Sequence, residues 1–146
     1  GMAPLLSLLR HAAETGLNRS VHFYYGARTA ADLFYLDEIA DLGDRLADFT
    51  FTACLSSSMD GAPDGVRVAG GNVTDIVRAA EPELGRTEVY FCGPPPMVDA
   101  ALALAADACA RLNRAVVEEG REIRGNVAAS PIVLFSGPSH LKVMAV

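Results

Sequence analysis

Hydrophobic residues recur at helical spacing near the start of the chain, and a short run of strand-forming residues follows. Pro4 suits a first helical turn, and leucines and alanines three or four positions apart continue to Gly16. Residues 21–25, Val-His-Phe-Tyr-Tyr, are β-branched or aromatic apart from the histidine, and they end at Gly26. The pattern predicts an amphipathic helix that begins almost at residue 1, followed by a buried strand.

The same alternation continues through the middle of the chain. Acids separate aliphatic residues over 33–42, which predicts a second helix, and the helical spacing assigns Phe34 and Tyr35 to its core face. Residues 49–55, Phe-Thr-Phe-Thr-Ala-Cys-Leu, predict a second strand. The segment 56–71 is expected to be loop, because its turn-forming residues are Gly61, Pro63, Gly65, Gly70 and Gly71.

The last third of the chain completes the pattern. It predicts a helix over 73–80, a strand over 89–91, an alanine-rich helix from Met97 to about Leu112, and a strand-like segment over 131–137. Strands that alternate with helices are typical of parallel sheets covered on both faces. We therefore expect an α/β fold with a doubly wound parallel sheet in a three-layer α/β/α arrangement.

Composition excludes several classes of protein. A chain of 146 residues that is 51% hydrophobic can bury one core, and its longest uncharged apolar stretches are far shorter than the roughly 20 residues that span a bilayer. The net charge of −6 argues against a nucleic-acid partner. Three widely spaced cysteines without a Cys-x-x-Cys pair predict neither disulfides nor a metal site, and a reducing cytoplasm fits best.

Charge changes along the chain. Residues 1–110 carry a net charge of −8 and residues 111–146 a net charge of +2, with the change near Arg111. There is no internal repeat or low-complexity tract. We expect one domain over 1–110 and a divergent tail over 111–146 that contains one possible strand.

The predicted strand ends carry the candidate chemistry, because ligands of open parallel sheets bind beyond the carboxyl ends of strands. Gly26-Ala27-Arg28, Ser56-Ser57-Ser58 and Cys92-Gly93-Pro94 follow the three strands. Glycine admits a ligand close to the backbone, and hydroxyl and guanidinium groups bind ribose or phosphate. Taken singly, each segment is better explained as an ordinary turn.

Two further segments add detail to this edge. Gly1-Met2-Ala3-Pro4 opens directly into the first helix, where amide groups at the positive end of the helix dipole suit a pyrophosphate. Pro94-Pro95-Pro96 after Cys92 predicts a rigid wall that is poor in hydrogen-bond donors. Cys92 is either a small buried hydrophobe or a ligand contact, and with no visible base it is not a nucleophile.

Four stretches occur in an order that resembles the pyridine-nucleotide domain of the ferredoxin–NADP reductase-like family: GMAPLLSLLR, FYYGARTAADLFYLDEI, FTACLSS and VYFCGPPPMVDAAL. Within that family they are most similar to reductase components of soluble diiron monooxygenases of the propane, methane and phenol type. The resemblance covers about residues 1–104. It implies an NAD-binding domain in which each stretch contributes to the coenzyme site.

The resemblance assigns roles to individual positions. Gly1, Ala3 and Pro4 match the last part of a pyrophosphate-binding glycine loop, and Met2 lies within it. Gly26 and Arg28 match a loop near the nucleotide, and Ser56, with Ser57 next to it, borders the adenosine ribose. The turn at the third strand would lie under the nicotinamide and help to present its C4 to the flavin; its matching residues are Cys92, Gly93, Pro94, Pro95 and Met97.

The resemblance also implies cofactors and partners. The serine segment 56–58 offers no basic side chain for a 2′-phosphate and Asp60 adds an acid, which favours NADH over NADPH, although Arg67 in the same predicted loop could reverse that preference. FAD would be held by a separate domain that is missing upstream, together with any [2Fe-2S] domain. Electrons would pass to a monooxygenase hydroxylase.

Two departures from the family pattern stand out. The family's domain begins with a central strand of a sheet ordered 3-2-1-4-5, and this chain starts after that strand, as if N-terminally truncated. The usual last strand with an aromatic-acidic ending is also missing. We expect Ile132–Phe135 to pair within the sheet, either at the outer edge beside residues 89–91 or in the vacant central position.

The function expected from these observations is that of an NADH-dependent flavoprotein oxidoreductase component. The chain would bind NADH and orient it for hydride transfer to FAD, and it would be inactive without the flavin domain. Two alternatives remain: a nucleotide-binding module without redox turnover, and a truncated product without function.

Overall fold

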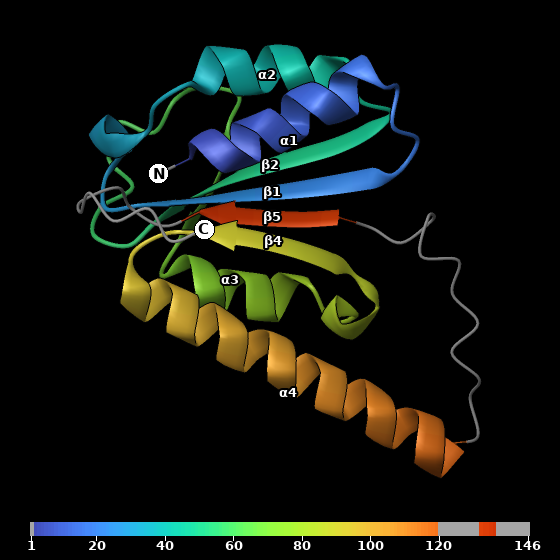
Figure 1. Ribbon diagram of the computed structural model, residues 1–146. Helices are drawn as coiled ribbons and strands as arrows, with labels where there is room; N and C mark the ends of the chain where they lie inside the picture. The colour runs from blue at the N-terminus through green and yellow to red at the C-terminus, as the bar shows by residue number, and fades with distance from the viewer. Residues whose placement is uncertain (1, 120–131, 137–146) are drawn as a thin grey trace.

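The computed structural model describes residues 2–119 and 132–136, and these form an α/β structure with one central sheet (Figure 1). The strands are β1 (Ser20–Ala27), β2 (Asp48–Leu55), β3 (Arg67–Gly70), β4 (Glu88–Cys92) and β5 (Ile132–Ser136). The α-helices are α1 (Ala3–Glu14), α2 (Leu36–Asp44), α3 (Val73–Ala80) and α4 (Pro95–Glu119), with single 3-10 turns at Ala30–Asp32 and Leu84–Arg86.

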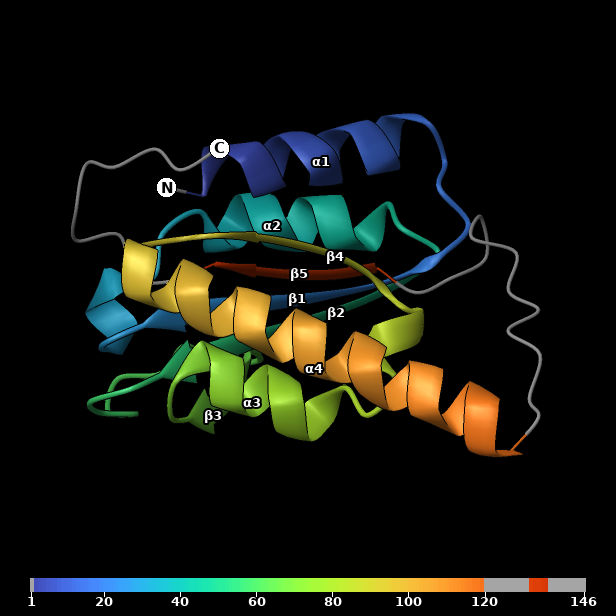
Figure 2. The same cartoon turned by 60° about the horizontal axis from the view of Figure 1, so that its bottom comes forward.

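The sheet has the strand order β3-β2-β1-β5-β4, and every pair of neighbouring strands is parallel. Helices α1 and α2 cover one face, and α3 and α4 cover the other (Figure 2). The predicted doubly wound, three-layer fold is therefore confirmed. Because all strands are parallel, their carboxyl ends lie at one edge, where Ala27 of β1 is level with Leu55 of β2.

Side chains along the central strands alternate between the two faces, as the pleat of a strand requires. Phe23 and Leu134 are buried among the leucines of α1 and α2, whereas Tyr24 and Val133 pack with α3 and α4. Phe23 and Val133 are fully buried. Each half of the core thus has its own hydrophobic cluster, and both clusters share the strands β1 and β5.

Strand β5 takes the central position. It pairs in parallel with β1 on one side, where Phe23 is the partner of Leu134, and with β4 on the other, where Tyr90 is the partner of Leu134. The second of the two alternatives for Ile132–Phe135 is thereby confirmed. The C-terminal part of the chain supplies the strand that the resemblance assigns to a segment before the glycine loop.

Helix α4 is longer than the sequence pattern predicts. It continues without a break through Arg111 to Glu119. The ladder of β5 ends at Ser136. The change in charge near Arg111 therefore falls inside a helix and not between two structural elements.

The segment 56–71 is not entirely loop, so that prediction was wrong in part. Residues Arg67–Gly70 form β3, which pairs with the last four residues of β2. Backbone hydrogen bonds to the edge of β2 and the partial burial of Val68 hold this strand, although glycine is unfavourable in strands. The density of Gly and Pro around it concealed the strand in the sequence.

The interpretation of Phe34 and Tyr35 as core residues was also wrong. Their exposed fractions are 54% and 60%, because α2 begins only at Leu36. Tyr35 adopts a left-handed backbone conformation with φ +63° and accommodates the turn into the helix. That turn rotates both aromatic side chains out of the helical repeat on which the prediction was based.

Candidate functional site

A cavity lies at the carboxyl edge of the sheet, on the face covered by α3 and α4. Its volume is about 340 Å³. Three strand ends contribute to its lining: Gly26 and Ala27 of β1, Cys54 and Ser56 at the end of β2, and Pro94 after β4. The remaining lining residues come from the beginnings of α3 and α4: Gly71, Asn72, Val73, Thr74, Pro96, Met97 and Ala100.

Hydrogen bonds between neighbouring strand ends fix the shape of this edge. The backbone N–H of Ser56 donates to the carbonyl oxygen of Ala27 at 3.0 Å, and that of Ser57 donates to the carbonyl oxygen of Arg28 at 2.9 Å. On the other side of β2, the N–H of Gly71 donates to the carbonyl oxygen of Leu55 at 2.9 Å. The loop after β1, the serine segment and the start of α3 are thus tied together by the backbone.

Gly71 is required at the turn from β3 into α3. Its φ of +132° lies in a region that side-chain-bearing residues rarely adopt. The turn brings Asn72, Val73 and Thr74 to the cavity, and the sequence analysis did not identify any of them as site residues. The consecutive glycines before Asn72 were the signal that could have indicated a close approach of backbone to ligand.

Four of the predicted binding residues line this cavity together. They come from three different segments of the sequence, and they are Gly26, Ser56, Pro94 and Met97. The segments that carry these four residues are far apart in the sequence. They come together because parallel strands end at the same edge of the sheet.

Other predicted residues lie at the same edge but outside the cavity lining. Met2 is buried in the cluster on the α1 face, together with Cys92, while Ala3 and Pro4 are exposed at the start of α1. Arg28, Ser57 and Gly93 are at the carboxyl ends of the strands but do not line the cavity. Gly1 lies outside the described residues.

The start of α1 offers a second feature at this edge. Figure 1 shows the N-terminus next to the carboxyl ends of the strands. Pro4 lies in the first turn of α1, and the N-cap position at Met2 makes no side-chain capping bond. The positive end of the helix dipole therefore faces the rim that also carries Arg28 and the proline corner.

Two buried cysteines flank the site on opposite faces of the sheet. Cys54 has no exposed surface and lines the cavity, and burial raises the pKa of its thiol to about 12. Cys92 is 6% exposed, and burial likewise raises the pKa of its thiol. Both side chains are therefore neutral thiols at physiological pH and resemble small apolar groups more than nucleophiles.

Arg28 is an exposed cation at this rim. Within residues 2–119 and 132–136, no hydrogen bond or ion pair engages its guanidinium group. The backbone carbonyl of Arg28 accepts a hydrogen bond from the N–H of Ser57, which fixes the position of its backbone. The guanidinium group stays available for an anion.

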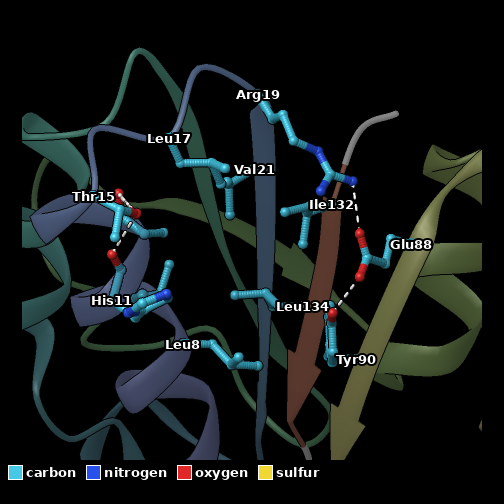
Figure 3. A pocket seen from close by; sticks show the side chains of 12 residues that line it. Leu8, His11, Thr15, Leu17, Arg19, Val21, Glu88, Tyr90, Ile132 and Leu134 are labelled. Atoms are coloured by element: carbon cyan, nitrogen blue, oxygen red, sulfur yellow. Dashed lines mark hydrogen bonds and ion pairs between the residues drawn. The ribbon is translucent and has the colours of Figure 1, made fainter. Parts of the chain in front are cut away.

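A second groove lies on the α1 face, toward the amino ends of the strands (Figure 3). Its volume is about 190 Å³, and its wall is mainly aliphatic, with Leu8, Val21 and Leu134 among the lining residues. Arg19, Glu88 and Tyr90 form a polar rim in which Glu88 accepts hydrogen bonds from both neighbours. The groove contains none of the predicted site residues.

The described part of the chain contains neither a membrane-spanning helix nor a cluster of metal ligands. No helix there is both long and apolar enough to cross a membrane. No group of three or more His, Cys, Asp or Glu side chains within it is placed to hold a metal ion.

Known proteins match the chain over segments of about 100 residues. The chain is 77% identical over 105 residues to the reductase component of propane 2-monooxygenase from Gordonia sp. (strain TY-5), which covers 72% of this chain and 30% of that protein. The corresponding component from Rhodococcus jostii (strain RHA1) is 70% identical over 105 residues, or 71% of this chain and 28% of the relative. The chain thus spans less than a third of the length of these relatives.

A more distant relative extends the similarity to a different oxygenase system. The electron transfer component of toluate 1,2-dioxygenase from Pseudomonas putida is 33% identical over 100 residues, covering 68% of this chain and 28% of the relative. No solved structure matches the chain. The family model for the oxidoreductase NAD-binding domain matches residues 1–102, which include every strand end that lines the cavity, and the chain belongs to this family.

Proposed function

We propose that the chain binds NADH at the carboxyl edge of the sheet and orients the nicotinamide for hydride transfer to FAD on a separate domain. The observation that carries this proposal is the cavity in which Gly26, Ser56 and Met97 meet from three separate segments. A cavity of about 340 Å³ is within the usual range for small-molecule sites. It lies where open α/β sheets bind their ligands.

The start of α1 and Arg28 supply the groups that suit the pyrophosphate. The amide groups of Met2 and Ala3, at the positive end of α1, favour an anion, and Pro4 presets the first turn. The uncommitted guanidinium of Arg28 provides the opposite charge at the same rim. Ser56 and Ser57 would hydrogen-bond to ribose hydroxyls.

The proline corner suits the nicotinamide ring. Pro94 and Met97 present an apolar surface, and Gly93 before them lets a flat ring come close to the backbone. Cys92 lies on the α1 face of the sheet, outside the cavity lining, as a neutral thiol, so the role we assign to it is support of this corner from behind and not covalent chemistry.

The charges around the serine segment favour NADH over NADPH. Asp60 accepts a hydrogen bond of 2.9 Å from the hydroxyl of Ser58, so the loop presents a carboxylate where a 2′-phosphate would need a cation. Arg67 begins β3 opposite Thr52, three residues back from the edge at which Leu55 pairs with Gly70. This position keeps Arg67 away from the serine segment.

FAD supplies the hydride acceptor and the one-electron chemistry when it is bound on its own domain. The relatives are reductase or electron transfer components of oxygenase systems and are more than three times as long as the matched segment. We therefore propose a flavin domain, and with it a [2Fe-2S] domain, as partners within the complete reductase. A monooxygenase hydroxylase would receive the electrons.

Isothermal titration calorimetry of the 146-residue chain with NADH and with NADPH tests the binding step. We expect NADH to bind and NADPH to bind more weakly. Addition of a flavin domain from a propane 2-monooxygenase reductase should then give NADH-dependent reduction of ferricyanide, while the chain without it should show none. Absence of NADH binding would refute the proposal, and binding without any reduction would favour a nucleotide-binding module.

A further inference from the structure

The two helices that begin at the cavity have unlike first turns. Pro94 precedes helix α4, whose first two residues are Pro95 and Pro96, and proline has no backbone N–H. The first N–H groups in this helix, those of Met97 and Val98, already donate to the carbonyl oxygen of Pro94 at 2.9 and 3.1 Å. This end of the cavity therefore has few donors and suits the face of an apolar ring.

Helix α3 begins at the other end of the cavity and keeps its donors. Its N-cap residue Asn72 makes no side-chain capping bond. The N–H groups of Asp75 and Ile76 both donate to the carbonyl oxygen of Asn72 at 3.1 Å. The earlier N–H groups, those of Val73 and Thr74, have no carbonyl one turn back within the helix, so they need a partner from outside it.

Thr74 adds a buried hydroxyl group to this helix start. Its exposed fraction is only 8%, and it lines the cavity. Over the described ranges no hydrogen bond involves its side chain. Buried hydroxyl groups are costly when they lack a partner, so most of them have one. The structure thus contains a donor without an acceptor, placed in the cavity wall.

The charges around the start of α3 indicate which kind of ligand atom its N–H groups and the hydroxyl of Thr74 would bind. None of the described residues that line the cavity is charged. Asp75, in the first turn of α3, is 63% exposed and forms an ion pair of 3.0 Å with Arg78 on the same helix. Among the described residues, the N–H groups of Val73 and Thr74 have no acceptor, and a helix start with these two groups and a hydroxyl favours an oxygen acceptor, either neutral or anionic.

We infer that Thr74 and the first amides of α3 bind an oxygen of the adenosine half of NADH, in its ribose or phosphate part. This inference rests on the proposed function. When the nicotinamide ring lies against the donor-poor start of α4, the oxygen-rich half of the coenzyme extends toward α3. Ser56 also lines the cavity; its hydroxyl donates to the carbonyl oxygen of Ala27 at 3.4 Å, and the hydroxyl oxygen can still accept a hydrogen bond from the ligand.

Replacement of Thr74 by valine tests the inference, because it keeps the shape of the side chain and removes the hydroxyl. We expect calorimetry on the full chain to show NADH and ADP-ribose both binding about fivefold more weakly, the loss of one neutral hydrogen bond. Thr74→Ser should bind both ligands like the wild type. Thr52→Val is the matched control, since Thr52 is 6% exposed but lies outside the cavity lining.

The possible results are distinguishable. Unchanged binding of both ligands by Thr74→Val would overturn the inference and leave the proposed function standing. Weaker binding of NADH with unchanged binding of ADP-ribose would also overturn it, because the contact would then be to the nicotinamide half. A wild-type chain that binds neither ligand would refute the proposed function itself. If the melting temperature of Thr74→Val is below that of Thr52→Val, Thr74→Ala provides a second test without the hydroxyl. The inference then requires Thr74→Ala to weaken the binding of both ligands by the same factor, and unchanged binding would overturn it.

Discussion

Phe23 of β1 and Leu134 of β5 are parallel partners at the centre of the sheet, although 111 positions separate them in the sequence. Both side chains are buried in the cluster that faces α1 and α2. The contact shows that the C-terminal strand is part of the core and not an appendage. The proposed nucleotide site depends on it, because β5 lies between β1, which carries Gly26, and β4, which leads to Pro94.

Replacement of Leu134 by alanine should destabilise the whole domain. Leu134 is 2% exposed, and a cavity of this kind usually costs about 2–5 kcal/mol of unfolding free energy. Denaturant unfolding measures the loss. Leu102→Ala on the exposed side of α4, where the leucine is 55% exposed, is the control and should change little. Equal stability of the two variants would mean that β5 does not occupy the centre of the sheet in solution.

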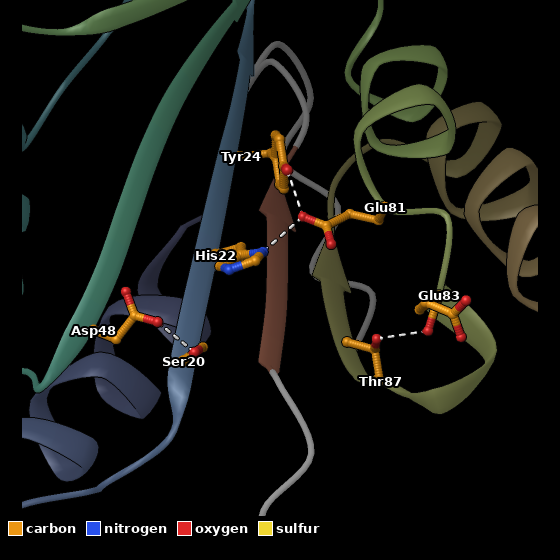
Figure 4. A network of polar contacts seen from close by, with 7 residues as sticks. All are labelled: Ser20, His22, Tyr24, Asp48, Glu81, Glu83 and Thr87. Carbon is orange, nitrogen blue, oxygen red and sulfur yellow. Dashed lines mark hydrogen bonds and ion pairs between the residues drawn. The ribbon is translucent and has the colours of Figure 1, made fainter.

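A polar network fixes the end of α3 to the sheet (Figure 4). The hydroxyl of Tyr24 donates a hydrogen bond of 2.5 Å to Oε1 of Glu81, and Nδ1 of His22 lies 2.7 Å from the same oxygen. Burial and the bond to Glu81 raise the pKa of Tyr24. The network holds the helix whose first turn forms the donor end of the cavity.

Tyr24→Phe should therefore lower the stability of the chain. It leaves the carboxylate of Glu81, whose side chain is 12% exposed, without one donor, at a cost of about 1–2 kcal/mol. The melting temperature should fall by roughly 3–8 °C. Tyr35→Phe removes the hydroxyl of a tyrosine that is 60% exposed and should leave the melting temperature unchanged. A loss of the same size in both variants would rule out a specific role for the network.

Glu88 should make stability depend on pH in the acid range. Hydrogen bonds from Tyr90 and Arg19 lower the pKa of its carboxyl below the ordinary value of 4.5. Because the folded-state pKa is lowered, the stabilisation is complete above 4.5 and is lost as the pH falls through the folded-state value. Glu88→Gln should flatten this part of the stability curve, measured by urea unfolding between about pH 6 and pH 3.

The control for that experiment is a carboxylate with a looser ion pair. Glu83, whose side chain is 76% exposed, lies 3.5 Å from Arg86. Glu83→Gln should leave the dependence of the unfolding free energy on pH unchanged in the acid range, since exposed ion pairs contribute little to stability. If Glu88→Gln also retains the wild-type curve, the Arg19–Glu88–Tyr90 cluster has no role in acid stability.

Cys92→Ala tests the proposed support of the corner at which the nicotinamide would lie. In the chain reconstituted with a flavin domain, the variant should slow hydride transfer more than it weakens NADH binding, because the thiol supports the ring without holding the rest of the coenzyme. Stopped-flow absorbance and calorimetry measure the two effects. Cys109→Ala, at an exposed position of α4 outside the cavity lining, is the comparison. Equal losses of rate and affinity for Cys92→Ala would instead indicate a packing role.

Helices and strands could be predicted from the sequence wherever hydrophobic residues kept one regular spacing along the whole element. The strand that contains Phe23 and the helix that contains Leu5 and Leu9 were predicted in this way, and the parallel sheet followed from their alternation. β3 was missed because its pairing depends on the backbone of β2 and because the glycines and Pro63 around it indicate a loop. For β5, the pattern predicted a strand, but the choice between the edge and the centre depends on contacts across the sheet.

The site could be predicted only where a strand end carried an unusual sequence. Gly26, Ser56 and Pro94 were found in this way, and parallel packing brings them together. Thr74 was missed because threonine in the first turn of a helix has no distinctive pattern. The role that we infer for it rests on its burial and on the absence of a partner for its hydroxyl within the described structure.

The location of bound NADH is the most direct test of the account. Assigned ¹H–¹⁵N spectra of the full chain, recorded during a titration with NADH, report the amide groups that the coenzyme affects. We predict the largest shifts at Gly26, Ser56, Gly71, Thr74 and Met97. Shifts confined to the aliphatic groove on the α1 face, at Leu8, Arg19 and Glu88, would contradict the account.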